Sequence, residues 1–262
     1  MSTSAISDPA CPAASASTAA PAASTVVVLQ PMFFPWIGHL EQIRLADVFV
    51  HYDDVQLSPG GFGNRVQLKT AQGKQWLTAP IEHAGLRTIA ETRLCEKRDW
   101  RTQHLRTLQQ AFAKAPCRDD AVGLVEQVYR ARHETLADLC IASVEALADY
   151  FALRTEFVRS STLAIGGRAT ARVVAICQRF QAQRYVTGHG ARNYLEHDRF
   201  TAADIDVRYM DYARTPYPQQ HGPFDPHCTA LDLVANCGRD GRWAIASGTR
   251  PWQQFVQTPP TP

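Results

Sequence analysis

The sequence predicts an α/β protein with a mostly parallel, Rossmann-like sheet, a helical insertion and an antiparallel hairpin. Three observations lead to this prediction. Two apolar, β-branched runs flank a stretch with helical spacing near the start of the chain. Short apolar strands alternate with helical stretches toward its end. A purely helical region lies between these two parts.

The first unit runs in the order strand, loop, helix, strand. Residues 25–29 (TVVVL) form a continuous apolar run of the kind that a parallel sheet buries on both faces. Pro31 and Pro35 then enforce a loop, and residues 37–46 carry apolar side chains at helical spacing. Residues 47–52 are the second strand. A strand–helix–strand connection predicts that the two strands are parallel.

A hairpin and three helices are expected next. Two alternating segments, 64–69 and 74–79, flank a Gly-containing turn, which is typical of a hairpin. A helical insertion over about residues 97–152 follows, with helices predicted at 99–115, 120–130 and 135–151.

The remaining chain returns to alternating elements, with strands expected at 157–158, 184–186 and 205–209 and helices at 172–180 and 229–236. In open α/β sheets, ligands bind beyond the carboxyl ends of the strands. The loops at 30–36, 53–65 and 187–194 are therefore the expected positions of a site.

The two ends of the chain differ from this central domain, which is expected over residues 25–250. Residues 1–24 are almost all Ala, Ser, Thr and Pro, with one charge and no aromatic side chain. Such a segment buries too little apolar surface to offset its ordering entropy, so a disordered tail is predicted. It lacks the basic region and the unbroken apolar run of a signal peptide. A short C-terminal tail is expected over 251–262.

Composition excludes several classes of protein. With 27 Lys and Arg against 25 Asp and Glu, the net charge of +2 does not suggest a nucleic-acid-binding protein. The seven cysteines form no C-x-x-C pair, so no zinc site is expected, and reduced thiols of a cytoplasmic protein are the simpler interpretation. No apolar run is long enough to span a membrane. The expected partner is a small-molecule substrate.

The first loop supplies candidate binding residues. Gln30 ends a buried strand, so its amide would face a ligand with donors and an acceptor. Trp36-x-Gly38-His39 resembles the second half of the HxGH signature of the nucleotidylyltransferase superfamily, with Trp36 in place of the first His. That resemblance implies ATP binding at a helix N-terminus. A tight turn and a His39 that packs or faces solvent are the alternative interpretation.

The segment after the second strand combines acids and bases. Asp53 and Asp54 suit Mg²⁺ binding, base catalysis or the holding of an amine, and the alternative is a turn cap beside a solvated carboxylate. Asn64 and Arg65 follow a Gly-rich stretch and would grip a phosphate or carboxylate. Strand alternation places Lys69 on the same face as Arg65.

A second strand-to-helix turn contains Gly188, Gly190 and Arg192, which suit an anion. His189 would act there as acid or base, with a Gly-rich turn carrying a surface His as the alternative.

Near the end of the chain, the Pro-rich stretch that contains Tyr217 and Gln219 leads into the last predicted helix. Asp232 lies on that helix, either as a helix-face carboxylate or as a partner of Arg65 or Arg192. His221 and His227 do not have a recognised ligand spacing, so no metal site is predicted.

Several blocks of the chain together resemble the WbqC-like protein family. QPMFFPWIGHL, DVFVHYDDVQ, NRVQLK and WLTAPI match its opening, and YVTGHGARNYL and YPQQHGPFDPHCTALDLVANCG match later blocks, over about residues 26–238. Four positions depart from the family pattern: Leu29 stands where His is frequent, Pro59 for Lys, Phe62 for Trp and Thr229 for Ser.

The resemblance implies a role in surface-glycan biosynthesis. The family is associated with bacterial O-antigen and other surface-polysaccharide (lipopolysaccharide) gene clusters, some of whose sugars carry aminoacyl groups on an amine. The implied protein is a cytoplasmic transferase or amide-forming ligase that modifies a nucleotide-linked amino sugar or a similar amine. ATP-dependent and carrier-dependent aminoacyl (glycyl) transfer both fit, and ATP with Mg²⁺ would be the cofactor of the ligase. Assembly into a homo-oligomer stays open.

In that hypothesis, Arg65, Lys69 and Arg192 hold phosphate or carboxylate groups. His39 and His189 stabilise charge in the transition state.

The remaining candidates contact polar substrate atoms. Asp53 or Asp54 orients the amine, and Gln30 and Gln219 bind other polar groups of the substrate.

Two alternatives stay open. One is a non-catalytic nucleotide-sugar or glycan binding module, whose sugar-binding face would be formed by Trp36, Trp76, Tyr217 and Phe224. The other is acyl transfer by a cysteine nucleophile, Cys228 or Cys237, although both are also expected as small buried side chains.

Overall fold

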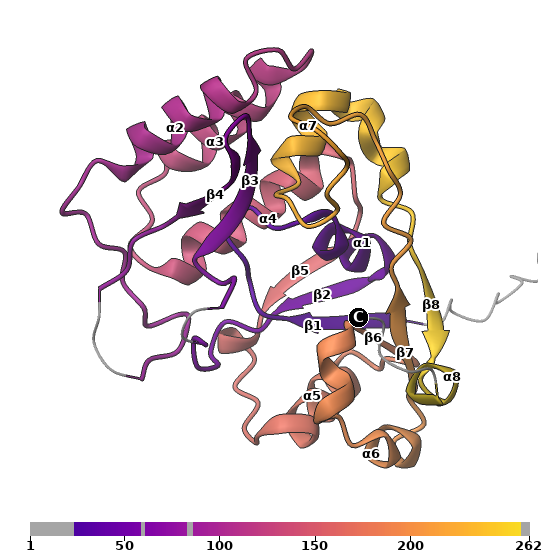
Figure 1. Ribbon diagram of the computed structural model, residues 1–262. Coiled ribbons are helices and arrows are strands. Elements are labelled where there is room, and N and C mark those ends of the chain that lie inside the picture. Colours follow the sequence, from indigo (N-terminus) through magenta and orange to yellow (C-terminus); the bar gives the residue numbers. More distant parts are fainter. Residues whose placement is uncertain (1–23, 59–60, 83–85, 258–262) are drawn as a thin grey trace, which may run out of the picture.

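A six-stranded sheet is the centre of the protein. The computed structural model describes residues 24–58, 61–82 and 86–257. The strands lie in the order β5-β2-β1-β6-β7-β8, and all neighbouring pairs are parallel except β7 and β8 (Figure 1). The predicted α/β class is therefore confirmed. The strands are β1 (Thr25–Leu29), β2 (Val48–His51), β5 (Glu156–Arg159), β6 (Arg184–Thr187), β7 (Asp206–Asp211) and β8 (Gly248–Pro251).

Helices cover both faces of this sheet (Figure 1). On one face lie α1 (Ile37–Leu45), α4 (Leu136–Tyr150) and α7 (Leu231–Cys237), and on the other lie α5 (Ala169–Arg179) and α6 (His197–Ala202). Successive side chains of a strand point to opposite faces, so Val27 packs with the first group of helices while Val26 and Val28 pack with the second. The result is two separate apolar cores.

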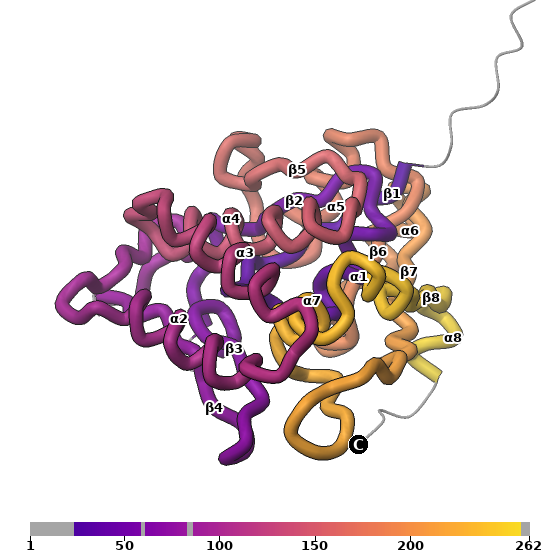
Figure 2. The backbone as a smooth tube through the Cα atoms, turned by 90° about the horizontal axis from the view of Figure 1, so that it is seen from above, coloured from indigo at the N-terminus to yellow at the C-terminus, as the bar shows by residue number. Residues whose placement is uncertain are grey.

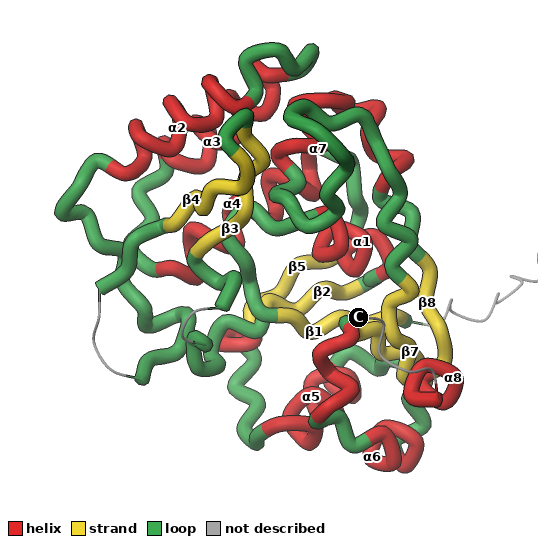
Figure 3. Tube along the Cα trace, viewed as in Figure 1, coloured by secondary structure: helices red, strands yellow, loops and turns green. Residues whose placement is uncertain are grey.

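The predicted hairpin forms a sheet of its own. β3 (Arg65–Thr70) pairs antiparallel with β4 (Gly73–Thr78). Figure 2 shows the hairpin beside α2 (Trp100–Ala111) and α3 (Arg118–Arg130), on the side of the molecule away from β8. The described residues between β4 and α2 are largely loop (green in Figure 3).

The three helices predicted between residues 97 and 152 are present. Two of them begin at side-chain caps. Asp99 accepts a hydrogen bond from the backbone N–H of Thr102 at the start of α2. Thr135 accepts one from the N–H of Asp138 at the start of α4, and its hydroxyl donates to the Asp138 carboxylate at 2.7 Å.

The C-terminal region differs from the prediction. Residues 251–257 were expected as a tail, yet β8 pairs with β7 and α8 (Trp252–Gln257) follows it. Trp252 and Phe255 pack against the second core, which explains why so short a helix is held in place. Of the predicted N-terminal tail, residues 1–23 lie outside the described residues, as do residues 258–262. Among the described helices, none has the length and apolar character that crossing a membrane requires.

Candidate functional site

The sheet order places a topological switch point at β1. From β1 the chain moves to β2 and later to β5 on one side, and it then crosses over to β6 and β7 on the other side. The loops after β1 and β6 therefore diverge, and ligands of open α/β sheets bind at such a place. The segments that follow β1, β2, β5 and β6 all begin at the carboxyl ends of these parallel strands. We call this side of the sheet the switch-point edge.

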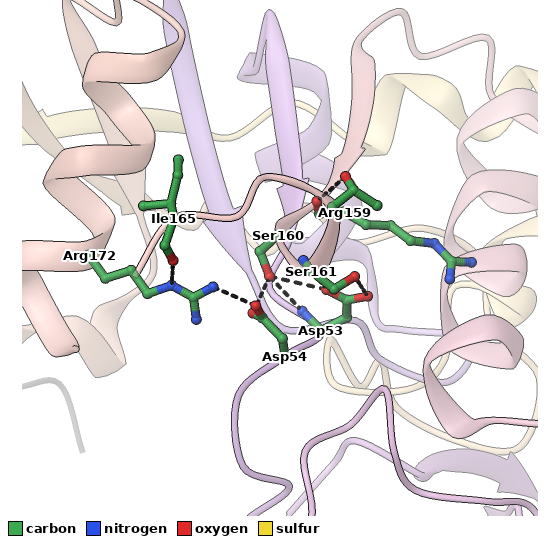
Figure 4. A network of polar contacts seen from close by, with 8 residues as sticks. Asp53, Asp54, Arg159, Ser160, Ser161, Ile165 and Arg172 are labelled. Atoms are coloured by element: carbon green, nitrogen blue, oxygen red, sulfur yellow. Dashed lines mark hydrogen bonds and ion pairs between the residues drawn. The ribbon is translucent and has the colours of Figure 1, made fainter. Parts of the chain in front are cut away.

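Asp53 joins two of these segments. It follows β2 and is 1% exposed, and its carboxylate accepts hydrogen bonds from the N–H of Ser161 at 3.0 Å and from the Ser161 hydroxyl at 2.8 Å (Figure 4). The backbone N–H of Asp53 donates in turn to the Ser160 hydroxyl at 3.2 Å. Ser160 and Ser161 belong to the short turn after β5. Asp53 thus fixes the loop after β2 to the end of β5.

Asp54 has a different environment, although it is the next residue. Its side chain is 26% exposed, and it accepts hydrogen bonds of 2.5 Å from Ser160 Oγ and from Arg172 Nη2. Partial burial raises the pKa of Asp54, but the hydrogen bonds from Arg172 and Ser160 outweigh burial and bring the pKa below its usual value. Asp54 is therefore an ionised carboxylate that solvent reaches.

Arg172 is fixed by more than one contact. It lies on α5, its side chain is 11% exposed, and its Nε donates to the carbonyl of Ile165 at 2.9 Å. Its guanidinium lies 5.1 Å from the ring centre of Tyr52, at the end of β2. The Asp54 site consists of Asp53, Asp54, Ser160, Ser161 and Arg172.

Tyr194 ends the turn after β6, and its side chain is 62% exposed. The contacts of the Asp54 site thus come from the loop after β2, the turn after β5 and α5.

Other predicted residues lie along the same edge. Gln30 is exposed at the end of β1, and Gly188 precedes the turn after β6. A Cβ at Gly188 would lie 3.2 Å from the Tyr212 hydroxyl, so only glycine fits easily there. His189 and Gly190 are exposed, and His189 Nε2 donates to the carbonyl of Met210 at 2.8 Å.

Arg192 is turned toward the C-terminal helix. It donates to the carbonyl of Val256 at 2.6 Å, and its guanidinium lies 5.6 Å from the ring centre of Phe255. Its position is thus set by α8, an element that the sequence did not predict.

A second group of predicted residues forms a buried network away from this edge. Lys69 is 7% exposed, and its ammonium donates to Gln219 Oε1 at 3.1 Å and to the carbonyls of Gly222 at 3.1 Å and Pro223 at 2.5 Å. Gln219 Nε2 donates to the Tyr217 hydroxyl at 2.9 Å. These three side chains bind one another and the loop, so they hold the 217–225 segment on the hairpin.

Asp232 belongs to the same hydrogen-bond network. It is 2% exposed and accepts hydrogen bonds from the Tyr217 hydroxyl at 3.1 Å and from Asn236 Nδ2 at 3.2 Å. Burial raises the pKa of Asp232 to about 6, against the lowering effect of Tyr217 and Lys69. The partner of Asp232 was expected to be Arg65 or Arg192; the structure provides Tyr217 and Asn236.

His39 conflicts with its predicted catalytic role. It is 1% exposed, packs 5.5 Å from the ring centre of Phe49, and neither ring nitrogen has a hydrogen-bond partner within the described residues. Burial, together with His51, lowers the pKa of His39 to about 3, so the ring is neutral. α1 is buried from Ile37 to Ile43, and His39 therefore faces the core instead of a ligand.

Trp36 and Gly38 of the same motif contact each other. The indole of Trp36 covers Gly38 so closely that a Cβ there would lie 2.2 Å from Cη2. The ring centre of Trp36 is 5.0 Å from that of Tyr212 and 5.6 Å from that of His227.

Asn64 and Arg65 belong to the hairpin. Asn64 Nδ2 donates to the carbonyl of Ala79 at 3.0 Å. Arg65 Nε donates to the carbonyl of Gly61 at 3.2 Å, and its guanidinium lies 4.5 Å from the ring centre of Trp76. These contacts hold both side chains against the hairpin and the loop that precedes it.

Neither carboxylate of the Asp54 site offers a ready Mg²⁺ ligand. Mg²⁺ takes carboxylate and water oxygens in a near-octahedral shell. Asp53 is engaged by serine groups and Asp54 by Ser160 and Arg172. The part of the chain that the structure describes contains no group of three or more His, Cys, Asp or Glu arranged to hold a metal. Within the described residues, the two aspartates thus do not form a metal site by themselves.

Sequence reasoning found Asp53 and Asp54 but missed their partners. Ser160 and Ser161 come two and three residues after the strand predicted at 157–158, so the rule about carboxyl ends would have found them. Arg172 has no such signal, because it lies on a helix and reaches Asp54 across 118 positions of sequence.

Comparison with known proteins agrees with the sequence resemblance. The model of the WbqC-like protein family matches residues 30–243, which include the Asp54 site and the buried network. A protein of Mycobacterium tuberculosis with the name "Uncharacterized protein Rv1507c" is 31% identical over 219 residues, which cover 82% of this chain and 94% of that protein. No solved structure matches the chain.

Proposed function

The chain belongs to the WbqC-like protein family, and from that premise we propose that it transfers an aminoacyl group to the amine of a nucleotide-linked amino sugar, or of a similar amine, in surface-polysaccharide biosynthesis. The observation that carries this proposal is Asp54. An ionised, partly exposed carboxylate at the switch-point edge is suited to hold a cationic amine.

The lowered pKa of Asp54 favours an anchoring role over a basic one. A carboxylate with a depressed pKa is a poor proton acceptor near neutral pH, but it stays charged and attracts an ammonium group. Arg172 and Ser160 each fix one of its oxygens, which sets the direction in which the free lone pairs point. Asp54 therefore orients the amine beside the loops after β1 and β6.

The bond changes of the transfer are simple. The ammonium group loses one proton to water, and its neutral nitrogen then attacks the carbonyl carbon of an activated aminoacyl group. The nitrogen loses a second proton to water as the amide forms. The new N–C bond forms as the bond from that carbon to its leaving group breaks, and the leaving group departs with the electron pair. No step requires a metal held by the two aspartates.

The test is a direct search for the amide product. The protein is incubated with a UDP- or dTDP-linked 4-amino sugar and either glycine with ATP and Mg²⁺ or a glycyl thioester. Mass spectrometry detects the glycylated sugar, and a coupled assay detects pyrophosphate. Absence of product and of pyrophosphate with every amine acceptor would refute acyl transfer. Binding of the nucleotide sugar without any product would favour a non-catalytic binding module.

A matched pair of variants locates the site. Asp54→Asn removes the charge that holds the amine and is expected to reduce kcat/KM at least about tenfold. Asp206→Asn is the control, because Asp206 also pairs with arginines, Arg184 at 3.6 Å and Arg208 at 3.4 Å, but lies at the start of β7, on the opposite edge of the sheet. Equal losses in the two variants would contradict the assignment.

A further inference from the structure

A groove separates β4 from α2 on the hairpin side of the molecule. It has a volume of about 750 Å³, and it is lined by β4, by the loop that precedes α2 and by the first turns of α2. Figures 1 and 2 both show β4 and α2 side by side. This volume is in the range of pockets that hold small-molecule ligands. The hairpin groove, as we name it, shares no residue with the Asp54 site.

The charge of the hairpin groove is positive. Lys97, Arg98 and Arg106 line it, and no Asp or Glu is among its lining residues. Within the described residues, no hydrogen bond or ion pair engages these three side chains. The acids next to the groove are occupied: Glu96 pairs with Arg101 at 2.5 Å, and the carboxylate of Asp99 caps α2. Three cationic side chains that line the same groove are suited to bind a multiply charged anion.

Aromatic side chains form the other part of the lining. Trp76 lines the groove and is 43% exposed, with Arg65 4.5 Å from its ring centre. Such an indole provides a flat apolar surface for a ring of a ligand.

Trp100 also lines the groove, and it is 4% exposed. Its indole N–H is buried and has no hydrogen-bond partner among the described residues. The indole packs edge-on against His104, at 5.2 Å between ring centres, and against Tyr129, at 5.3 Å. Trp100 is therefore part of the apolar floor of the groove.

We propose that the hairpin groove binds a phosphate-bearing small molecule that has a ring with an apolar face. The phosphate oxygens bind Lys97, Arg98 and Arg106, and the ring packs on Trp76. A nucleoside diphosphate and a sugar phosphate share this chemistry. The proposal does not depend on the reaction proposed for the Asp54 site.

Calorimetry with the full chain tests the proposal. The probes are UDP, glucose 1-phosphate, uridine and inorganic pyrophosphate, all at one ionic strength. UDP or glucose 1-phosphate is expected to bind at least about tenfold more tightly than pyrophosphate, because the ring adds a contact with Trp76. Tighter binding of UDP identifies a nucleotide, and tighter binding of glucose 1-phosphate identifies a sugar phosphate. Equal binding of pyrophosphate, or no binding of any probe, would overturn the proposal.

Variants connect the binding to the groove. Trp76→Ala and Arg106→Gln change exposed side chains and are each expected to weaken binding about tenfold or more. The control is Arg130→Gln, which removes an exposed cation at the end of α3, outside the groove. An equal loss in the control would show non-specific attraction of anions and refute the site.

A spectroscopic measurement reports on the two tryptophans of the groove, Trp76 and Trp100, without altering them. The chain has five tryptophans, so a ¹⁵N-labelled sample gives few indole N–H signals. The signals of Trp76 and Trp100, which line the groove, are expected to shift when the ligand binds, and unchanged signals at saturation contradict binding in the groove. Asp54→Asn is expected to bind the same probes as the wild type, so failure of the proposed reaction and failure of the groove are distinguishable.

Discussion

Replacing Gly38 by alanine is expected to destabilise the protein, although alanine is the better helix former. Gly38 lies in the first turn of α1, where the indole of Trp36 covers it. An added Cβ would lie 2.2 Å from Cη2, 2.4 Å from Cζ2 and 2.6 Å from Cζ3 of that ring. Because carbon atoms pack at about 3.5–4.0 Å, the indole must move by more than about 1 Å.

Two opposing contributions set the magnitude. Alanine in place of glycine favours a helix by about 1 kcal/mol. Displacing the indole from Tyr212, at 5.0 Å, and from His227, at 5.6 Å, costs about 1–3 kcal/mol as overpacking. Aromatic contacts add about 0.5–1.5 kcal/mol. The expected net loss in the free energy of unfolding is about 1–2 kcal/mol.

Urea denaturation followed by far-UV circular dichroism measures this loss in a double-mutant cycle. In a Trp36→Ala background the clash is absent, so Gly38→Ala is expected to stabilise the protein by about 0.5–1 kcal/mol. The sign of the effect thus reverses, and the coupling energy is about 2 kcal/mol.

The chain offers a matched control for helix propensity. Gly123 is an exposed glycine inside α3, and a Cβ there would meet nothing within 4 Å. Gly123→Ala is expected to stabilise by about 0.5–1 kcal/mol. If Gly38→Ala stabilised the wild-type protein as Gly123→Ala does, or if its cost stayed the same without Trp36, the geometric argument would be refuted.

Three further predictions concern charged or titratable side chains. The pKa of His39 is lowered from 6.5 to about 3, so between these two pH values only the unfolded chain binds a proton there. Between pH 6.5 and 4.5 the wild type is expected to lose about 2 kcal/mol of stability relative to His39→Leu, measured by urea denaturation. A parallel pH dependence of the two proteins would contradict this. The pKa of Asp232 is raised from 3.8 to about 6, so the native state keeps the proton to higher pH than the unfolded chain does. As the pH rises from about 3 to 7, the wild type should lose about 3 kcal/mol of stability relative to Asp232→Asn and then stay constant. A difference that grows in the opposite direction would be inconsistent with burial. Arg172→Met leaves Asp54 without its cation, at an expected cost of about 1–2 kcal/mol because the pair is partly exposed. The pKa of Asp54 is depressed, so this cost is fully present above pH 3.8 and disappears as the pH falls below it, and a cost independent of pH would argue for lost packing instead.

Local pattern was enough to predict most of the elements. β1, α1 and β2 each contain a pattern of apolar residues that has only one good interpretation over a short window, and their order requires parallel pairing. β8 and α8 escaped prediction for the same physical reason. Each has only four to six residues, and each is stable because of contacts with β7 and the second core, not because of its own sequence.

The candidate site shows where sequence reasoning ends. The position of Asp53 and Asp54 after a strand predicted that they lie at the ligand-binding edge of the sheet. Which of them is buried and which stays ionised and exposed depends on Ser160, Ser161 and Arg172, which lie more than 100 residues away. Two adjacent residues of one type are equivalent in sequence, and only their tertiary partners make them different.

His39 is a second residue whose environment the sequence could not predict. A helix with one exposed face indicates by its periodicity which side chains meet solvent, but α1 is packed on all sides from Ile37 to Ile43. The sequence determined that a histidine stands on the first helix. Whether that histidine would meet a ligand or the core was decided by the packing of α1 against the sheet, because burial depends on neighbours that are distant in the chain.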